Sequence, residues 1–70
     1  MKNVTILVVD DEPQIRRVLR VTLSSNGYEV IEAKNGEEAI ATVIRERPDL
    51  ILLDVNMPGM SGFEVYLFSA

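Results

Sequence analysis

Three aspartates of this 70-residue chain stand where carboxylate chemistry would be expected: the adjacent pair Asp10 and Asp11, and the isolated Asp54. The pair follows an apolar run over residues 5–9, and Asp54 follows a second run over residues 50–53. Such runs predict strands buried on both faces, as in a parallel sheet. If the two strands are neighbours, about 4.8 Å apart, their carboxyl ends bring the three carboxylates together.

Three carboxylates at that range repel one another, which leaves two ways to stabilise them. Either one carboxyl keeps its proton, or a hard divalent cation neutralises the charge. Mg²⁺ prefers oxygen ligands and keeps several waters, so two carboxylates and a main-chain carbonyl suit it. The simpler alternative is that Asp10 and Asp11 form a solvated turn and that Asp54 is only a strand-end residue. Their place after two buried strands favours a site.

Composition excludes several function classes. The chain has no His and no Cys, which argues against zinc, copper, disulfides and histidine-dependent nucleophilic catalysis. The net charge of −4 argues against a nucleic-acid partner, and we interpret Arg16, Arg17 and Arg20 as one solvated helix face. Without an apolar run of about 18 residues or a signal-peptide pattern, we expect no membrane segment and a cytoplasmic location.

The first two helices are predicted by their start and stop signals. Pro13 suits the first turn of a helix, and Gly27 suits its left-handed end. Asn35 predicts the start of a second helix, with Glu38 as its capping-box partner. The second helix carries an apolar stripe expected to face inward: Ala39, Ile40, Val43 and Ile44. Between the helices, residues 28–33 read as a strand, whose two glutamates indicate a sheet edge.

The last part of the chain predicts a strand, a loop and a helix start. We expect the third strand to end at Asp54, a loop over residues 55–60, and a third helix beginning at the capping pattern Ser61 to Glu64. Alternating strands and helices predict an α/β fold with a parallel sheet. In the strand order 2-1-3, the three aspartates lie at the switch point between the first and third strands.

These residues resemble a known family. The acidic segment Val8 to Glu12 and the segment Leu53 to Phe63 look like a receiver domain of a two-component response regulator, and so do residues 35–39 and 48–54. The resemblance runs from Val4 to Val65. It implies half of a doubly wound, flavodoxin-like parallel sheet in the order 2-1-3, with helices on both faces, in one domain over residues 1–70.

The resemblance also implies roles for the site residues. Asp54 would accept a phosphoryl group from the phosphohistidine of a histidine kinase. Asp11 would bind Mg²⁺ directly, Asp10 directly or through water, and the Asn56 main-chain carbonyl would complete the protein ligands together with Asp54. Complete receivers add a Thr or Ser and a Lys from later strands, beyond this sequence, so we expect any phosphorylation to be slow.

Two alternatives to a phospho-acceptor remain. A half-domain of this kind would expose its third strand, and two copies could pair there as a homodimer or higher oligomer without any catalytic role. An aspartyl-phosphate hydrolase would also use a strand-end Asp and magnesium. Such enzymes usually carry a second acid two residues after the nucleophile, where this chain has Asn56, so we expect no enzyme.

Overall fold

The computed structural model describes residues 3–57 and 60–67, with side chains over residues 3–53. Two helices and four strands alternate along most of the chain, in the following order and bounds: β1 (Thr5–Val9), α1 (Pro13–Ser25), β2 (Glu29–Ala33), α2 (Gly36–Glu46), β3 (Leu50–Met57) and β4 (Met60–Leu67). The strands form one sheet in the order β2-β1-β3-β4. No helix within the described ranges is long and apolar enough to cross a bilayer.

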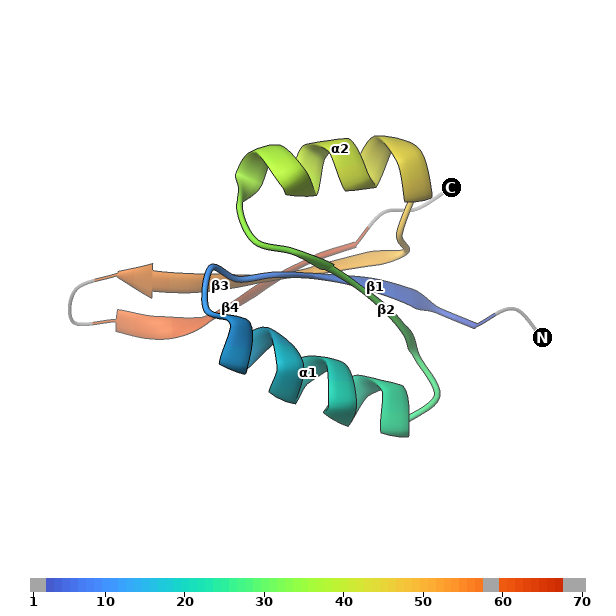
Figure 1. Cartoon of the computed structure of the whole chain (residues 1–70), viewed down its shortest axis with the longest axis horizontal. Coiled ribbons are helices and arrows are strands. Elements are labelled where there is room, and N and C mark those ends of the chain that lie inside the picture. Colours follow the sequence, from blue (N-terminus) through green and yellow to red (C-terminus); the bar gives the residue numbers. More distant parts are fainter. Residues whose placement is uncertain (1–2, 58–59, 68–70) are drawn as a thin grey trace.

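The parallel part of the sheet matches the predicted order 2-1-3. β1 lies in the centre and pairs in parallel with β2 on one side and with β3 on the other. The two helices lie on opposite faces of this part of the sheet, α2 above and α1 below in Figure 1. Both helices contact β1 and β2. The predicted α/β fold class is therefore confirmed, and β2 is an edge strand as its glutamates indicate.

The core is centred on β1. Leu7 and Val8 are fully buried on this strand, and alternate residues of a strand point to opposite faces. Leu7 and Val9 pack with Ala33 in one cluster, together with these half-buried residues: Ile31, Ala39, Val43, Ile51 and Leu53. Because that cluster includes α2 residues, this face of β1 is the one covered by α2.

Local sequence signals determine where α1 ends and where α2 begins. Gly27 adopts a left-handed φ of 89°, as expected for the residue that ends α1. The Asn35 side chain accepts a 2.8 Å hydrogen bond from the Glu38 N–H at the start of α2. The Glu38 carboxylate accepts from the N–H of Lys34 at 3.2 Å, one residue before the N-cap Asn35 that a capping box would use. The predicted end of α1 and the predicted start of α2 are thus confirmed.

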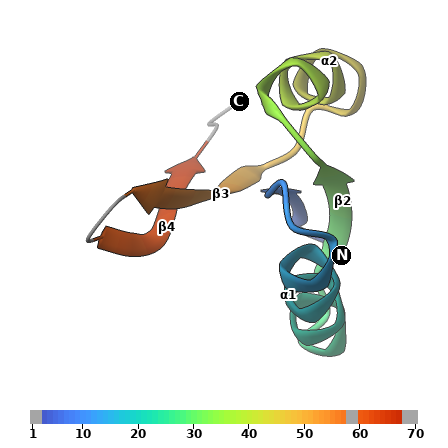
Figure 2. The same cartoon turned by 60° about the vertical axis from the view of Figure 1, so that its left-hand side comes forward.

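The predicted third helix is wrong. The segment Met60–Leu67 is a strand, β4, and it pairs antiparallel with β3 over eight registered positions, from Leu50 opposite Leu67 to Met57 opposite Met60. Figure 2 shows this hairpin extending to one side, away from both helices. Phe63, Val65 and Tyr66 favour strands, and pairing satisfies backbone groups along the outer edge of β3.

Two further expectations change with β4. β3 continues past Asp54 to Met57, so Asp54 and Asn56 lie within a strand and not at its end or in a loop. The outer edge of β3 is occupied by β4 of the same chain. The predicted dimer through an exposed third strand therefore does not fit this fold, because the pairing edge has a partner.

The expected inward stripe of α2 is only partly buried. Ala39 and Val43 pack on the core, whereas Ile40 and Ile44 are 65% and 72% exposed.

Candidate functional site

The acidic loop after β1 forms the best-defined polar site of the described residues. Asp10 follows β1 directly and is buried, with 3% of its surface exposed. Its N–H donates to the Ala33 carbonyl of β2 at 3.1 Å. Its Oδ1 accepts from the Glu12 N–H at 2.8 Å, which closes a turn of the kind that aspartates stabilise. Asp10 is thus held through its main-chain N–H and through one oxygen of its carboxylate.

One oxygen of Asp10 has no hydrogen-bond partner among the described residues. Oδ2 is buried and accepts no hydrogen bond from the described part of the chain. A buried carboxylate oxygen without a hydrogen bond is costly, since it has lost its water and gained nothing in return. The next residue, Asp11, is exposed. An oxygen-rich loop with one unsatisfied buried carboxylate atom fits a hard divalent cation such as Mg²⁺.

The sheet register places Asp54 at the same level as Asp10. β1 and β3 pair up to Val9 opposite Leu53, and the two aspartates are the next residues on these neighbouring strands. Their backbones therefore lie side by side, where parallel strands are about 4.8 Å apart. The side chains of Asp54 and Asn56 lie outside the described ones. Within the described residues alone, no group of three acidic side chains gathers closely enough to hold a metal.

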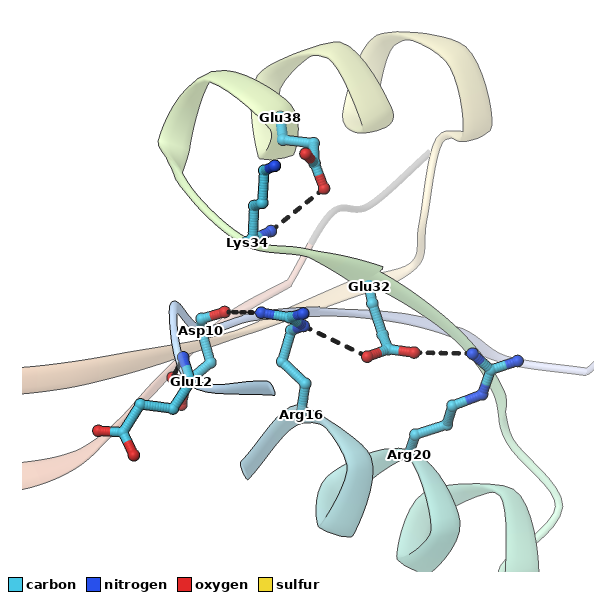
Figure 3. A network of polar contacts seen from close by, with 7 residues as sticks. All are labelled: Asp10, Glu12, Arg16, Arg20, Glu32, Lys34 and Glu38. Atoms are coloured by element: carbon cyan, nitrogen blue, oxygen red, sulfur yellow. Dashed lines mark hydrogen bonds and ion pairs between the residues drawn. The ribbon is translucent and has the colours of Figure 1, made fainter. Parts of the chain in front are cut away.

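An arginine network supports this loop (Figure 3). The Arg16 Nη1 donates to the main-chain oxygen of Asp10 at 2.7 Å, and its Nε donates to Glu32 at 3.3 Å. The second Glu32 oxygen accepts from Arg20 at 2.7 Å. The side chain of Arg16 is 17% exposed, whereas that of Arg20 is 59% exposed. Arg16 is therefore a partly buried structural contact between α1, β2 and the acidic loop.

This role of Arg16 differs from the expectation that Arg16, Arg17 and Arg20 share one solvated face. That expectation is correct for the exposed Arg17 and wrong for the partly buried Arg16. A usable signal was present. Residues 16 and 20 are one helical turn apart, and Glu32 is one of two glutamates on a strand whose other residues are apolar. A pairing across the two elements could therefore have been anticipated.

Comparison with known proteins identifies the family. The family model described as "Response regulator receiver domain" matches residues 6–67. The chain belongs to this family. It is 49% identical over 65 residues to the phosphate regulon transcriptional regulatory protein PhoB of Pseudomonas aeruginosa, covering 93% of this chain and 28% of the relative. It is 46% identical to sporulation initiation phosphotransferase F of Bacillus subtilis, covering 93% of this chain and 52% of the relative.

The fold agrees with a solved receiver structure. The chemotaxis response regulator CheY4 of Vibrio cholerae superposes with a TM-score of 0.75 at 43% identity, covering 86% of this chain and 50% of that chain. This receiver-family chain thus spans about half of that structure, and between about a quarter and a half of the curated relatives named here. The family match includes Asp10, Asp11, Asp54 and Asn56, whose individual roles stay predictions.

Proposed function

We propose that this receiver-family chain is a phospho-acceptor whose Asp54 carboxylate takes a phosphoryl group from the phosphohistidine of a histidine kinase. In this transfer the nitrogen–phosphorus bond of the donor breaks as an oxygen–phosphorus bond to Asp54 forms. The observation that carries the proposal is the β1–β3 register, which sets Asp54 beside the buried Asp10. Family membership supports the same reaction class.

The acidic loop would bind the Mg²⁺ that neutralises the dianionic phosphoryl group. Asp10, through an Oδ2 that accepts no hydrogen bond from the described residues, and the exposed Asp11 would hold Mg²⁺. Asp54 and the Asn56 main-chain carbonyl would be the further ligands. When bound, Mg²⁺ supplies the charge neutralisation that lets an anionic carboxylate approach an anionic phosphoryl group. The chain's own part is to keep the loop carboxylates fixed, through the 2.8 Å bond inside the loop and the Arg16 bond from α1.

Intact-mass measurement tests the proposal. The folded protein is incubated with acetyl phosphate and Mg²⁺, beside Asp54→Asn and beside a sample with excess chelator. We expect a phosphoryl-sized mass increase in the parent only, and none in the variant or without Mg²⁺. A parent that is folded by circular dichroism and gains no mass contradicts the proposal. An increase that persists in Asp54→Asn would place the acceptor at another residue.

Phosphate release, measured in the same samples, separates an acceptor from an enzyme. We propose that the chain takes up one phosphoryl group per molecule and does not turn over a substrate, although one similar protein is named a phosphotransferase. Phosphate release far in excess of the protein concentration would contradict this. Several relatives are named transcriptional regulators, but the chain spans only about a quarter of them, and we propose no nucleic-acid contact for it. A cytoplasmic location and the absence of membrane contact remain predictions.

A second candidate is self-association, now through β4. This strand is at the outer edge of the sheet, and Glu64 is its one charged residue among eight. The opposite edge, β2, carries two glutamates among five residues, and charges on an edge discourage pairing with another chain. A homodimer through β4 predicts a mass in sedimentation that rises with concentration. Val65→Lys should favour the monomer, and Val21→Lys on the exposed face of α1 should not. A monomer at every concentration contradicts it.

A further inference from the structure

The side chain of Arg16 links three elements at the acidic loop. It projects from the first turns of α1, donates to the Asp10 carbonyl at 2.7 Å and pairs with Glu32 of β2 at 3.3 Å. Figure 3 shows the guanidinium lying between the loop and the strand. Because the guanidinium is planar and carries several donors in fixed directions, it can serve both partners at once. Glu32 thereby orients the group that holds the loop.

The loop has few other fixed contacts. Glu12, the N-cap residue of α1, makes no side-chain capping bond, and Asp11 and Glu12 are exposed. Among the hydrogen bonds of the described residues, the one from Arg16 is the single bond that a side chain outside residues 10–12 donates to this loop. Removing Arg16 would leave the loop tied to the rest of the fold by backbone bonds alone.

The Asp10 carbonyl that accepts the Arg16 bond lies between the two residues that carry the loop carboxylates. The Asp10 oxygen and the Asp11 nitrogen belong to one planar peptide group. Fixing that oxygen therefore fixes the plane joining the two residues that carry the loop carboxylates. The positive charge of Arg16 is partly offset at close range by Glu32, a carboxylate that it shares with Arg20, which reduces its repulsion of a cation at this loop. Arg16, paired with Glu32, thus orients Asp10 and Asp11 without being a ligand itself.

From these contacts we propose that Arg16, held by Glu32, is a positioning residue that presets Asp10 and Asp11 for Mg²⁺. The inference rests on the proposed function, since it assumes that this loop binds Mg²⁺. Residues that orient metal ligands from outside the ligand set typically change metal affinity by 10–100-fold when removed. We expect Arg16→Ala to weaken Mg²⁺ binding about tenfold.

The matched control is Arg20. It donates to the same Glu32 but is exposed and makes no described bond to the loop. Calorimetric titration with MgCl₂ gives the dissociation constant for the parent, Arg16→Ala, Arg16→Lys and Arg20→Ala. We expect Arg20→Ala to bind Mg²⁺ within about twofold of the parent. Arg16→Lys keeps the charge and one donor site without the planar fork, so its affinity should lie between those of the parent and Arg16→Ala.

Amide hydrogen exchange without metal provides a second reading. The Glu12 N–H donates to Asp10 Oδ1, so loosening the loop should speed its exchange. We expect faster exchange at Glu12 in Arg16→Ala and no change in Arg20→Ala. If Arg16→Ala does not fold, Arg16→Lys carries both measurements.

The outcomes separate the inference from the proposed function. A parent that binds no Mg²⁺ overturns both. A parent that binds Mg²⁺, with Arg16→Ala binding equally well and only unfolding at lower temperature, overturns the inference alone, because Arg16 would then be a merely structural contact. Weaker Mg²⁺ binding in Arg16→Ala but equally weak binding in Arg20→Ala also overturns it, since the effect would come from the surface charge and not from the bond to the loop.

Discussion

Two segments of this chain carry the same helix-start pattern and fold differently. Asn35 and Glu38 begin α2, while Ser61 and Glu64, with the same spacing, lie in strand β4. The first pattern introduces a segment with two alanines and an apolar face that packs on the core through Ala39 and Val43. The second introduces a segment rich in strand-favouring residues. A capping pattern therefore indicates a helix only where the following residues also favour one and have a surface to cover.

The surroundings of the two segments differ as well. α2 covers the face of β1 that carries the fully buried Leu7. Within the described part of the chain, β4 contacts no helix. It lies beside the long strand β3, whose backbone groups need partners along eight residues. Backbone pairing thus accounts for the second segment, and side-chain packing accounts for the first. Four measurements can sharpen or break this contrast.

The largest expected effect is on the packed region. Leu7→Ala removes a fully buried side chain and should cost about 2–5 kcal/mol of unfolding free energy, measured by urea unfolding with circular dichroism. Ile44→Ala is the control, because this side chain is 72% exposed, and it should change stability by no more than about 0.5 kcal/mol. An equal cost for both variants would mean that Ile44 is covered in solution, and the contrast with the hairpin would need revision.

Proline substitution tests the paired region. Successive N–H groups of a strand point to opposite edges, so of Val65 and Tyr66 one donates toward β3 and the other away from it. Between Val65→Pro and Tyr66→Pro, one variant should lose about 1–3 kcal/mol of stability through a missing ladder bond, and the other should lose much less. Two equally damaging prolines, seen in the same urea unfolding measurement, would indicate a helix interior and contradict β4.

The contrast between α2 and β4 also explains which parts of the fold the sequence predicts. The bounds of β1, the start of α1 at Pro13 and the cap at Asn35 agree with the structure because local signals and the packed core favour the same elements. The structure of residues 60–67 depends on pairing with the preceding strand β3, which the capping pattern and helix propensity of these residues alone do not take into account. Local propensity alone could not weigh a short helix against an antiparallel partner.

The candidate site likewise has features that the sequence predicts and features that it does not. The level of Asp10 and Asp54 on neighbouring strands follows from two apolar runs and the strand order, and the register agrees with it. The pairing of Arg16 with Glu32 has a sequence signal, but the Arg16 bond to the Asp10 carbonyl has none. That bond depends on how far α1 and the acidic loop lie from one another. The burial of Asp10, with one oxygen that has no partner among the described residues, also requires the packed fold, because a solvated turn remained an alternative in the sequence.

A smaller effect tests the cap that is used. Asn35→Ala removes the acceptor of the 2.8 Å bond from the Glu38 N–H, which leaves an N-terminal amide of α2 without its partner. Replacing such a cap typically costs about 1 kcal/mol, which urea unfolding resolves. Asn35→Asp keeps an acceptor oxygen at the same place and should retain most of the stability. A cost below about 0.3 kcal/mol for Asn35→Ala would show that α2 does not depend on its cap.

The smallest effect is the most informative about the second segment. If residues 60–67 form β4, Ser61 caps no helix, and Ser61→Ala should change the unfolding free energy by less than about 0.5 kcal/mol. If the same residues form a helix in solution, Ser61 would be its N-cap, and the substitution would cost about 1 kcal/mol, as at Asn35. Measuring the two alanine variants side by side decides between these structures, because the capping patterns match while the elements that follow them do not. Equal costs would overturn β4, whereas a cost confined to Asn35→Ala means that pairing with β3 has overridden the local helix signal.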